Sequence, residues 1–163
     1  MIQGSEDATD NGIIEKYCYD DDPANCDTYG GLYQWNETMQ YITPDSTTPG
    51  VQGICPPGWH IPTLDEFTTL SDAVGGDGNA LKEIGQGTGG GAGTNTSGFS
   101  ALLAGTRFNN GYFNRIGNNA FFWGSTEYYS GGANDLYFYG DGSYIYFGYG
   151  YKEDGFSVRC VKD

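Results

Sequence analysis

The chain has 163 residues, of which 37% are hydrophobic and 16% aromatic, and its formal net charge is −14. This length fits one domain with a proper core, to which the large aromatic rings bring apolar area. The negative charge argues against binding to nucleic acid or to anionic membrane surfaces, although solubility of an exposed protein is a plainer explanation for it. No apolar run is long enough to span a membrane, so we expect no direct membrane insertion.

The N-terminal third is expected to hold one helix behind a disordered end. Residues 1–12 are polar and are predicted to be disordered, whereas residues 13–163 are predicted to form a single domain. Residues 13–33 have the pattern of a strand, an acidic turn and the start of a helix. Residues 31–42 are then predicted to be helical, followed by a polar loop over residues 44–52. The apolar residues at helical spacing are Leu32, Trp35, Met39 and Ile42.

A capping box marks a second helix. The Thr63 hydroxyl is expected to accept from the Glu66 amide, while the Glu66 carboxylate reaches back to the Thr63 amide. This helix should end at Gly75-Gly76, with a short helical turn over residues 80–84. Residues 85–98 are glycine-rich and predict a mobile loop; they lack the following Lys of a phosphate-binding loop. The inward positions of the second helix are Leu64, Phe67, Leu70 and Val74.

From Phe99 onward the chain reads as short strands and turns. Residues 136–139 and 144–147 alternate with period two, and the link over residues 140–143 is typical of a hairpin. Residues 155–162 predict a closing strand. The expected inward positions are Leu136, Phe138, Ile145 and Phe147 in the hairpin, and Phe156, Val158 and Cys160 in the closing strand.

Four cysteines allow three disulfide pairings. We favour Cys18–Cys26, which closes a short acidic loop, and Cys55–Cys160, which ties the middle of the chain to its C-terminus. Two such bonds indicate an oxidising compartment; the alternative is four buried thiols.

Other candidate sites are weak. The only histidine, His60, is expected to be structural. The acidic loop Asp20–Asp27 offers oxygen ligands for calcium, but it lacks EF-hand spacing and is more simply a solvated turn. We therefore expect no metal site and no cofactor.

The stretch Asn109–Tyr151 has the composition of a binding surface. It contains nine of the 14 tyrosines, and Lys, Gln and Met are absent from it. Tyr gives large contact area with few torsions to freeze, and Gly, Ser and Asn adapt their hydrogen bonds, as in antibody binding loops. The alternative is that these tyrosines are ordinary strand residues. The candidate ligand-binding residues are Asn109, Asn110, Tyr112, Asn114, Arg115, Asn118, Asn119, Phe121, Tyr128, Tyr129, Asn134, Asp135, Tyr137, Tyr139, Asp141, Ser143, Tyr144, Tyr146, Tyr149 and Tyr151.

Five ordered motifs resemble a known family. They are YCYDDDPANCDTYGGLYQWNE, GICPPGWHIPT, SGFSALLAG, FWGSTE and GFSVRCVKD. From about Ile14 to Asp163 the chain is similar to the Fibrobacter succinogenes major paralogous domain of bacterial surface proteins. The resemblance implies an α+β, C-type-lectin-like fold, with two helices packed on short twisted antiparallel sheets and long irregular loops. In that fold Trp35, Trp59 and Trp123 are expected to hold the scaffold.

The resemblance also bears on function. Fold alone does not imply sugar binding, because the motifs of calcium-dependent sugar-binding lectins are absent. Formylglycine-generating enzymes share this fold type and use paired reactive cysteines. Here the cysteines lie in motifs that recur in non-enzymatic relatives, so we expect no enzyme.

In some family members the C-terminal part is the variable region of a diversity-generating retroelement. Such an element randomises template adenines, chiefly in AAC codons, which reach Tyr, Phe, Ser, Gly and Asp but not Lys, Gln, Glu, Met or Trp. The only Trp and Glu of the stretch, Trp123 and Glu127, lie in the FWGSTE motif, where scaffold residues are expected. The resemblance therefore implies a variable protein.

Taken together, the sequence predicts an extracellular or cell-surface protein that binds a protein or other large surface ligand. Arg115 is expected to anchor an acidic group of that ligand. The domain is expected to be monomeric or part of a larger surface protein. The alternative is a structural or adhesive module without one specific ligand.

Overall fold

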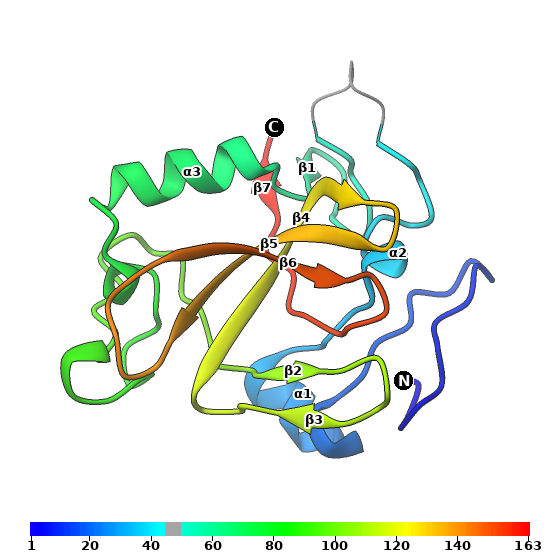
Figure 1. Cartoon of the computed structure of the whole chain (residues 1–163), viewed down its shortest axis with the longest axis horizontal. Helices are drawn as coiled ribbons and strands as arrows, with labels where there is room; N and C mark the ends of the chain where they lie inside the picture. The colour runs from blue at the N-terminus through cyan, green and yellow to red at the C-terminus, as the bar shows by residue number, and fades with distance from the viewer. Residues whose placement is uncertain (45–49) are drawn as a thin grey trace.

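A three-stranded antiparallel sheet lies at the centre of the fold (Figure 1). Its strands, in spatial order, are β4 (Asn119–Tyr129), β5 (Gly132–Tyr139) and β6 (Tyr146–Tyr151). Tyr137 of β5 lies opposite Phe121 of β4 and opposite Tyr146 of β6. The predicted hairpin is therefore confirmed, with a link that runs from residue 140 to residue 145.

The structure, a computed structural model, describes residues 1–44 and 50–163. The centre of the predicted polar loop, residues 45–49, lies outside the described residues. Short helices combined with short antiparallel strands make this an α+β fold, as predicted. The helices are η1 (Tyr19–Asp21), α1 (Pro23–Tyr29), α2 (Trp35–Thr38), α3 (Leu64–Ala73), η2 (Gly78–Ala80) and η3 (Gly89–Gly91). The remaining strands pair as β1 (Trp59–His60) with β7 (Val161–Lys162), and β2 (Thr106–Arg107) with β3 (Phe113–Asn114).

Apolar side chains cover both faces of β4 and β5. Successive residues of a strand point to opposite faces, so the neighbours Phe122 and Trp123 enter different cores. The core beside α3 contains Phe67, Leu81, Ala101, Leu103, Ala120, Phe122, Leu136 and Phe138. The core on the other face contains Trp35, Met39, Val51, Cys55, Ile61, Trp123, Ala133 and Phe156.

One predicted inward position of the hairpin is wrong. Phe147 is 42% exposed, because it lies on β6 at the end of the sheet while α3 packs on β4 and β5. Trp59 is also exposed, on the short strand β1. Leu136 and Phe138 are buried, and Ile145 packs against their core, as the alternation predicted.

The capping box of α3 is confirmed. The Thr63 Oγ accepts a hydrogen bond from the Glu66 amide at 3.2 Å, and the Glu66 Oε2 accepts one from the Thr63 amide at 2.8 Å. The Leu64 amide donates to the Thr126 hydroxyl of β4 at 3.1 Å, which joins the start of the helix to the central sheet. The helix ends before Gly75, as predicted.

The predicted helix over residues 31–42 is wrong in extent, because backbone pairing replaces its first turn. Leu32 pairs with Tyr17 and Tyr33 with Phe156 in isolated antiparallel bridges, so these residues are extended. Only α2 is helical, and positive φ angles at Gln40 and Tyr41 follow it. The apolar residues Leu32, Trp35 and Met39 are buried as expected, but Ile42 is exposed.

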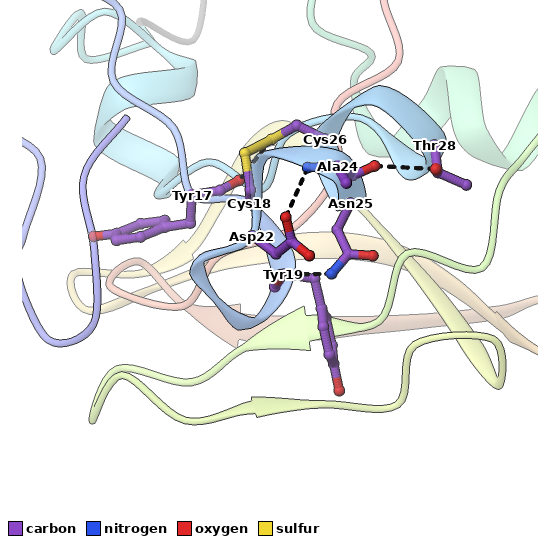
Figure 2. The surroundings of a disulfide bond; sticks show 8 residues. All are labelled: Tyr17, Cys18, Tyr19, Asp22, Ala24, Asn25, Cys26 and Thr28. Atoms are coloured by element: carbon purple, nitrogen blue, oxygen red, sulfur yellow. Dashed lines mark hydrogen bonds between the residues drawn. A yellow bond between two sulfur atoms is a disulfide. The ribbon is translucent and has the colours of Figure 1, made fainter.

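Both favoured disulfides are confirmed: Cys18–Cys26 and Cys55–Cys160. The first joins the residue before η1 to helix α1, as Figure 2 shows. That helix begins with Asp22, whose carboxylate accepts from the Ala24 amide at 3.0 Å, and with proline at its first position. An acidic cap followed by proline is a helix-start signal that the sequence carried.

The glycine-rich segment packs closely on the rest of the protein, which differs from the mobile loop that we predicted. The buried Lys82 donates from Nζ to the carbonyls of Gly91, Tyr139 and Gly142 at 2.5–3.0 Å. A Cβ at Gly91 would meet the backbone of residues 140–142 at less than 3 Å, so only glycine fits there. The segment thus supports the link between β5 and β6.

The N-terminal residues also make more contacts than we expected of a disordered end. The guanidinium of the buried Arg107 donates to the carbonyls of Gly4 and Glu6 and lies over the ring of Tyr17. The Gly4 amide donates to the Asp21 carboxylate at 3.0 Å. These bonds place the first residues beside strand β2.

We predict that loss of the Cys55–Cys160 bond destabilises the protein more than loss of the Cys18–Cys26 bond. The two bonds close loops of 105 and 8 residues, and loop-closure entropy grows with length. The double variant Cys55→Ala/Cys160→Ala should lower the free energy of unfolding by about 4–5 kcal/mol, and Cys18→Ala/Cys26→Ala by about 2–3 kcal/mol. Denaturant unfolding of both variants measures this; an equal loss or the reverse order would contradict it.

Candidate binding face

Four exposed or half-buried tyrosines form a first cluster over β5 and β6. We call Tyr137, Tyr139, Tyr144 and Tyr146 the strand cluster. The Tyr137 and Tyr146 rings stack with centroids 5.1 Å apart, and Tyr139 meets Tyr146 edge-on at 5.4 Å. Tyr144, at 71% exposure, extends the cluster into solvent. On its inner side Tyr137 stacks on Phe121 at 5.4 Å, so the cluster is anchored to the sheet.

A second group, Tyr128, Tyr129 and Tyr149, lies at the turn between β4 and β5, and we call it the turn cluster. The Tyr128 and Tyr149 rings stack at 4.5 Å, and Tyr129 meets Tyr149 edge-on at 6.0 Å. Tyr146 and Tyr149 are three residues apart in β6, so the pleat directs them to opposite faces of the sheet. The exposed tyrosines therefore form two patches rather than the single broad face that we expected.

A pocket of about 530 Å³ lies beside the strand cluster, and two glycines of β6 are part of its lining. A Cβ at Gly148 would stand 3.0 Å from the Asp135 Oδ1 and 3.0 Å from the Tyr137 ring. A Cβ at Gly150 would collide with the rings of Phe156 and Trp123. These glycines therefore let the Asp135 carboxylate and the aromatic rings pack directly against the backbone of β6. The residues that line the pocket include Phe108, Arg115, Phe121, Asp135, Tyr137, Tyr139, Tyr151, Asp154 and Phe156.

Asp135 has an unusual environment in this pocket. It is 3% exposed, and within the described residues its Oδ1 has no hydrogen-bond partner. The pKa of Asp135 is raised to about 7, because burial and the nearby Asp154 carboxylate raise it more than the backbone amide of Gly148 lowers it. Buried polar atoms are nearly always paired, so this oxygen calls for an explanation.

The second acid of the pocket, Asp154, is paired. Its carboxylate accepts from the amides of Asn109 at 2.9 Å and of Tyr151 at 3.3 Å. Burial raises the pKa of Asp154, and these two bonds and the charge of Arg107 lower it. Asp154 therefore ties the loop after β2 to the end of β6. It lies outside the stretch that the composition singled out.

Most of the candidate ligand-binding residues are at the surface. The exposed ones are Asn109, Asn110, Tyr112, Arg115, Asn118, Tyr128, Tyr129, Asp141, Tyr144, Tyr146, Tyr149 and Tyr151. The half-buried ones are Asn114, Phe121, Tyr137, Tyr139 and Ser143.

Three of the candidates are buried instead: Asn119, Asn134 and Asp135. They lie in β4 or β5, whose faces are both covered, so the polar side chain is enclosed whichever way it points. Asn119 and Asn134 are not available at the surface for a ligand, and Asp135 borders only the pocket. Sequence analysis also missed Phe108, which precedes the tyrosine-rich stretch.

Outside this face, His60 is not isolated as the sequence implied. Its ring nitrogens lie 2.8 Å from the Glu66 Oε1 and 2.6 Å from the Asp163 Oδ1. Burial lowers the pKa of His60, but the two carboxylates outweigh this and raise it. In the described residues no group of three or more acidic, His or Cys side chains is placed to hold a metal ion. No described helix has the length and apolarity needed to cross a membrane.

These features define a disulfide-bonded α+β protein that presents tyrosine clusters and an aromatic pocket at the end of its central sheet. The chain belongs to the Fibrobacter succinogenes major domain family, whose sequence model matches residues 2–162. The resemblance inferred from the five motifs is thus confirmed. Searches of curated proteins and of solved structures found no match. The α+β architecture is compatible with a C-type-lectin-like fold.

We predict that the stability of the Asp135→Asn variant, relative to that of the wild type, increases as the pH rises. Because the pKa of Asp135 is raised from 3.8 to about 7 on folding, its contribution to stability is full below pH 4 and is lost as the pH rises to 7. The melting temperature of the variant minus that of the wild type should therefore increase by about 5 °C or more between pH 4 and 8.

Asp141→Asn is the matched control, because it removes an exposed carboxylate from the same region. Its melting temperature should stay at a constant offset from that of the wild type. A difference between Asp135→Asn and the wild type that does not change with pH would show that the Asp135 carboxylate is solvated.

Proposed function

We propose that this protein binds a protein or another large surface ligand through the exposed tyrosines at the end of its central sheet. The supporting observation is the exposure of the strand and turn clusters on strands that a buried core holds. Tyr144 and Tyr149 leave more than half of their surface in water, where an aromatic ring gains nothing for stability. Exposed aromatic groups of this kind mark interaction sites.

The chemistry of the clusters suits recognition rather than catalysis. Tyrosine rings supply apolar contact area and their hydroxyls supply hydrogen bonds, at a low cost in side-chain entropy. Asn109 and Asn118 are exposed in the loops beside the strands and add polar contacts. We assign no catalytic role to the cysteines or to His60. All four cysteines are in disulfide bonds, and His60 lies between two carboxylates.

We further propose that a diversity-generating retroelement varies this face. The exposed residues are largely of the types that AAC codons reach by adenine changes. Trp123, which such changes cannot create from AAC codons, is buried in one of the two cores. If the exposed residues vary while the buried residues stay constant, the sequence can change without loss of the fold.

We also propose that the protein is displayed outside the cell. Disulfides persist in oxidising compartments and are rare in the cytosol, and this chain pairs all four of its cysteines. A strongly negative protein with exposed tyrosines is suited to meeting other proteins there, and its charge disfavours nucleic acid.

We predict that Tyr144→Ala/Tyr146→Ala abolishes ligand binding while the protein stays folded. An array of purified bacterial and host surface proteins would supply the ligand. The double variant should lose at least a hundredfold in affinity for it, because exposed tyrosines carry most of the contact energy. Its melting temperature should change by no more than about 3 °C, since both rings lie at the surface.

Tyr128→Ala/Tyr149→Ala is the matched variant, because it removes two stacked tyrosines from the turn cluster. Comparing the two double variants locates the ligand on one cluster or on both. Full binding by both variants, or a large loss of stability in place of a loss of binding, would contradict the proposed function.

A further inference from the structure

The pocket beside the strand cluster contains a buried acid without a partner. Asp135 lies in its lining next to Gly148, and the Oδ1 atom has no hydrogen-bond partner in the part of the chain that the structure describes. The protein thus keeps this carboxylate oxygen away from water, and the Gly148 amide is the backbone group that favours the charged form of Asp135. Such an arrangement is costly unless a donor from outside completes it.

We propose that this pocket receives the guanidinium group of an arginine side chain on the protein ligand, with Asp135 as its acceptor. The inference rests on the proposed binding function and specifies the chemistry that one part of the face recognises. A cation is favoured because the pocket holds two acids, Asp135 and Asp154, in a protein whose net charge is −14.

The walls of the pocket favour guanidinium over ammonium. Rings of Phe121, Tyr137 and Phe156 line it, and the planar, weakly hydrated guanidinium stacks on aromatic faces. The same group presents two parallel donors to one carboxylate. The terminal torsion of an aspartate is soft, so a small rotation turns either oxygen of Asp135 toward the pocket.

Gly148 places no side chain beside the Asp135 carboxylate. A methyl group at Gly148 would lie 3.0 Å from both the Asp135 Oδ1 and the Tyr137 ring, so it would crowd the acid and the ring next to it. No positive φ angle is recorded at Gly148, so its backbone accepts alanine. The variant Gly148→Ala therefore fills the approach to Asp135 without changing any charge.

The protein's own Arg115 borders the same pocket and is exposed. Its positive charge can repel an incoming cation, and its guanidinium can occupy the site until a ligand displaces it. In both cases Arg115 competes with the arginine side chain of the ligand. This assigns Arg115 a role different from anchoring an acidic group of the ligand. The other titratable groups in the lining are Asp154, Tyr137, Tyr139, Tyr149 and Tyr151.

The test is a titration of the ¹⁵N-labelled protein with N-acetyl-arginine amide, followed by NMR at pH 8. The amides of Gly148 and Gly150 should shift with a Kd of about 1 mM, as expected for a ligand of this size. N-acetyl-citrulline amide, which has the same shape without the charge, should give no saturable shift. N-acetyl-lysine amide should bind several-fold more weakly than the arginine compound.

Variants and pH then identify the acceptor. Asp135→Asn and Gly148→Ala should each weaken binding at least tenfold, whereas Arg115→Ala should strengthen it. Binding by the wild type should be about thirtyfold weaker at pH 5.5 than at pH 8, because a proton on Asp135 competes with the cation. No shift at 50 mM arginine compound, equal binding of citrulline, or full binding by Asp135→Asn would each overturn the proposal.

The outcome is separable from that of the proposed function. If the arginine compound does not bind but Tyr144→Ala/Tyr146→Ala still loses the protein ligand, the face binds by other chemistry and only the pocket inference fails. If the compound binds but neither tyrosine double variant affects the protein ligand, the pocket inference stands and the proposed tyrosine face fails.

Discussion

The burial of Trp123 in β4 is the interaction on which the rest of the fold depends. Its ring is fully enclosed and stacks on Phe156 with centroids 4.2 Å apart, and its Nε1 donates to the Tyr33 carbonyl at 2.7 Å. Its own amide donates to the Ser157 carbonyl. One residue thus joins the N-terminal segment, the central sheet and the C-terminal segment. The Cys55–Cys160 bond reaches the same core, so the chain is closed around this tryptophan.

This closure limits where a ligand can meet the protein. The two cores cover most of β4 and β5, which leaves β6, the far end of β4, the side chains of Tyr137 and Tyr139 and the neighbouring loops at the surface. The alternation of tyrosine and glycine in β6 follows from this position. Its glycines at 148 and 150 lie over the core and the pocket, while its tyrosines project into solvent. The same strand therefore completes the scaffold and carries several of the residues that we propose for recognition.

Local signals in the sequence predicted local structure well. The capping box at Thr63, the two disulfides and the antiparallel hairpin follow from residue types at short spacing or from simple pairing, and all are confirmed. The burial of Trp123 was also predicted.

The errors arise where distant parts of the chain decide the outcome. The apolar spacing around Leu32 is helical, yet pairing with Tyr17 makes that residue extended. Phe147 fits the period-two pattern of its strand, but α3 packs on β4 and β5 and leaves Phe147 of β6 exposed. Asp135 has the residue type of a surface ligand-binding group, and only the packing of its neighbours shows that it is enclosed. Composition therefore singled out a candidate binding region, and the contacts between strands divided it into exposed and buried positions.

The central claim is that the residues of this face vary while the residues beneath them do not. Sequencing the gene in several isolates tests it most directly. The account predicts substitutions at exposed positions such as Tyr144, Tyr146 and Tyr149, with constant residues at Trp123 and Phe138. Invariant tyrosine and asparagine codons across the isolates, or changes spread equally over exposed and buried positions, would contradict it.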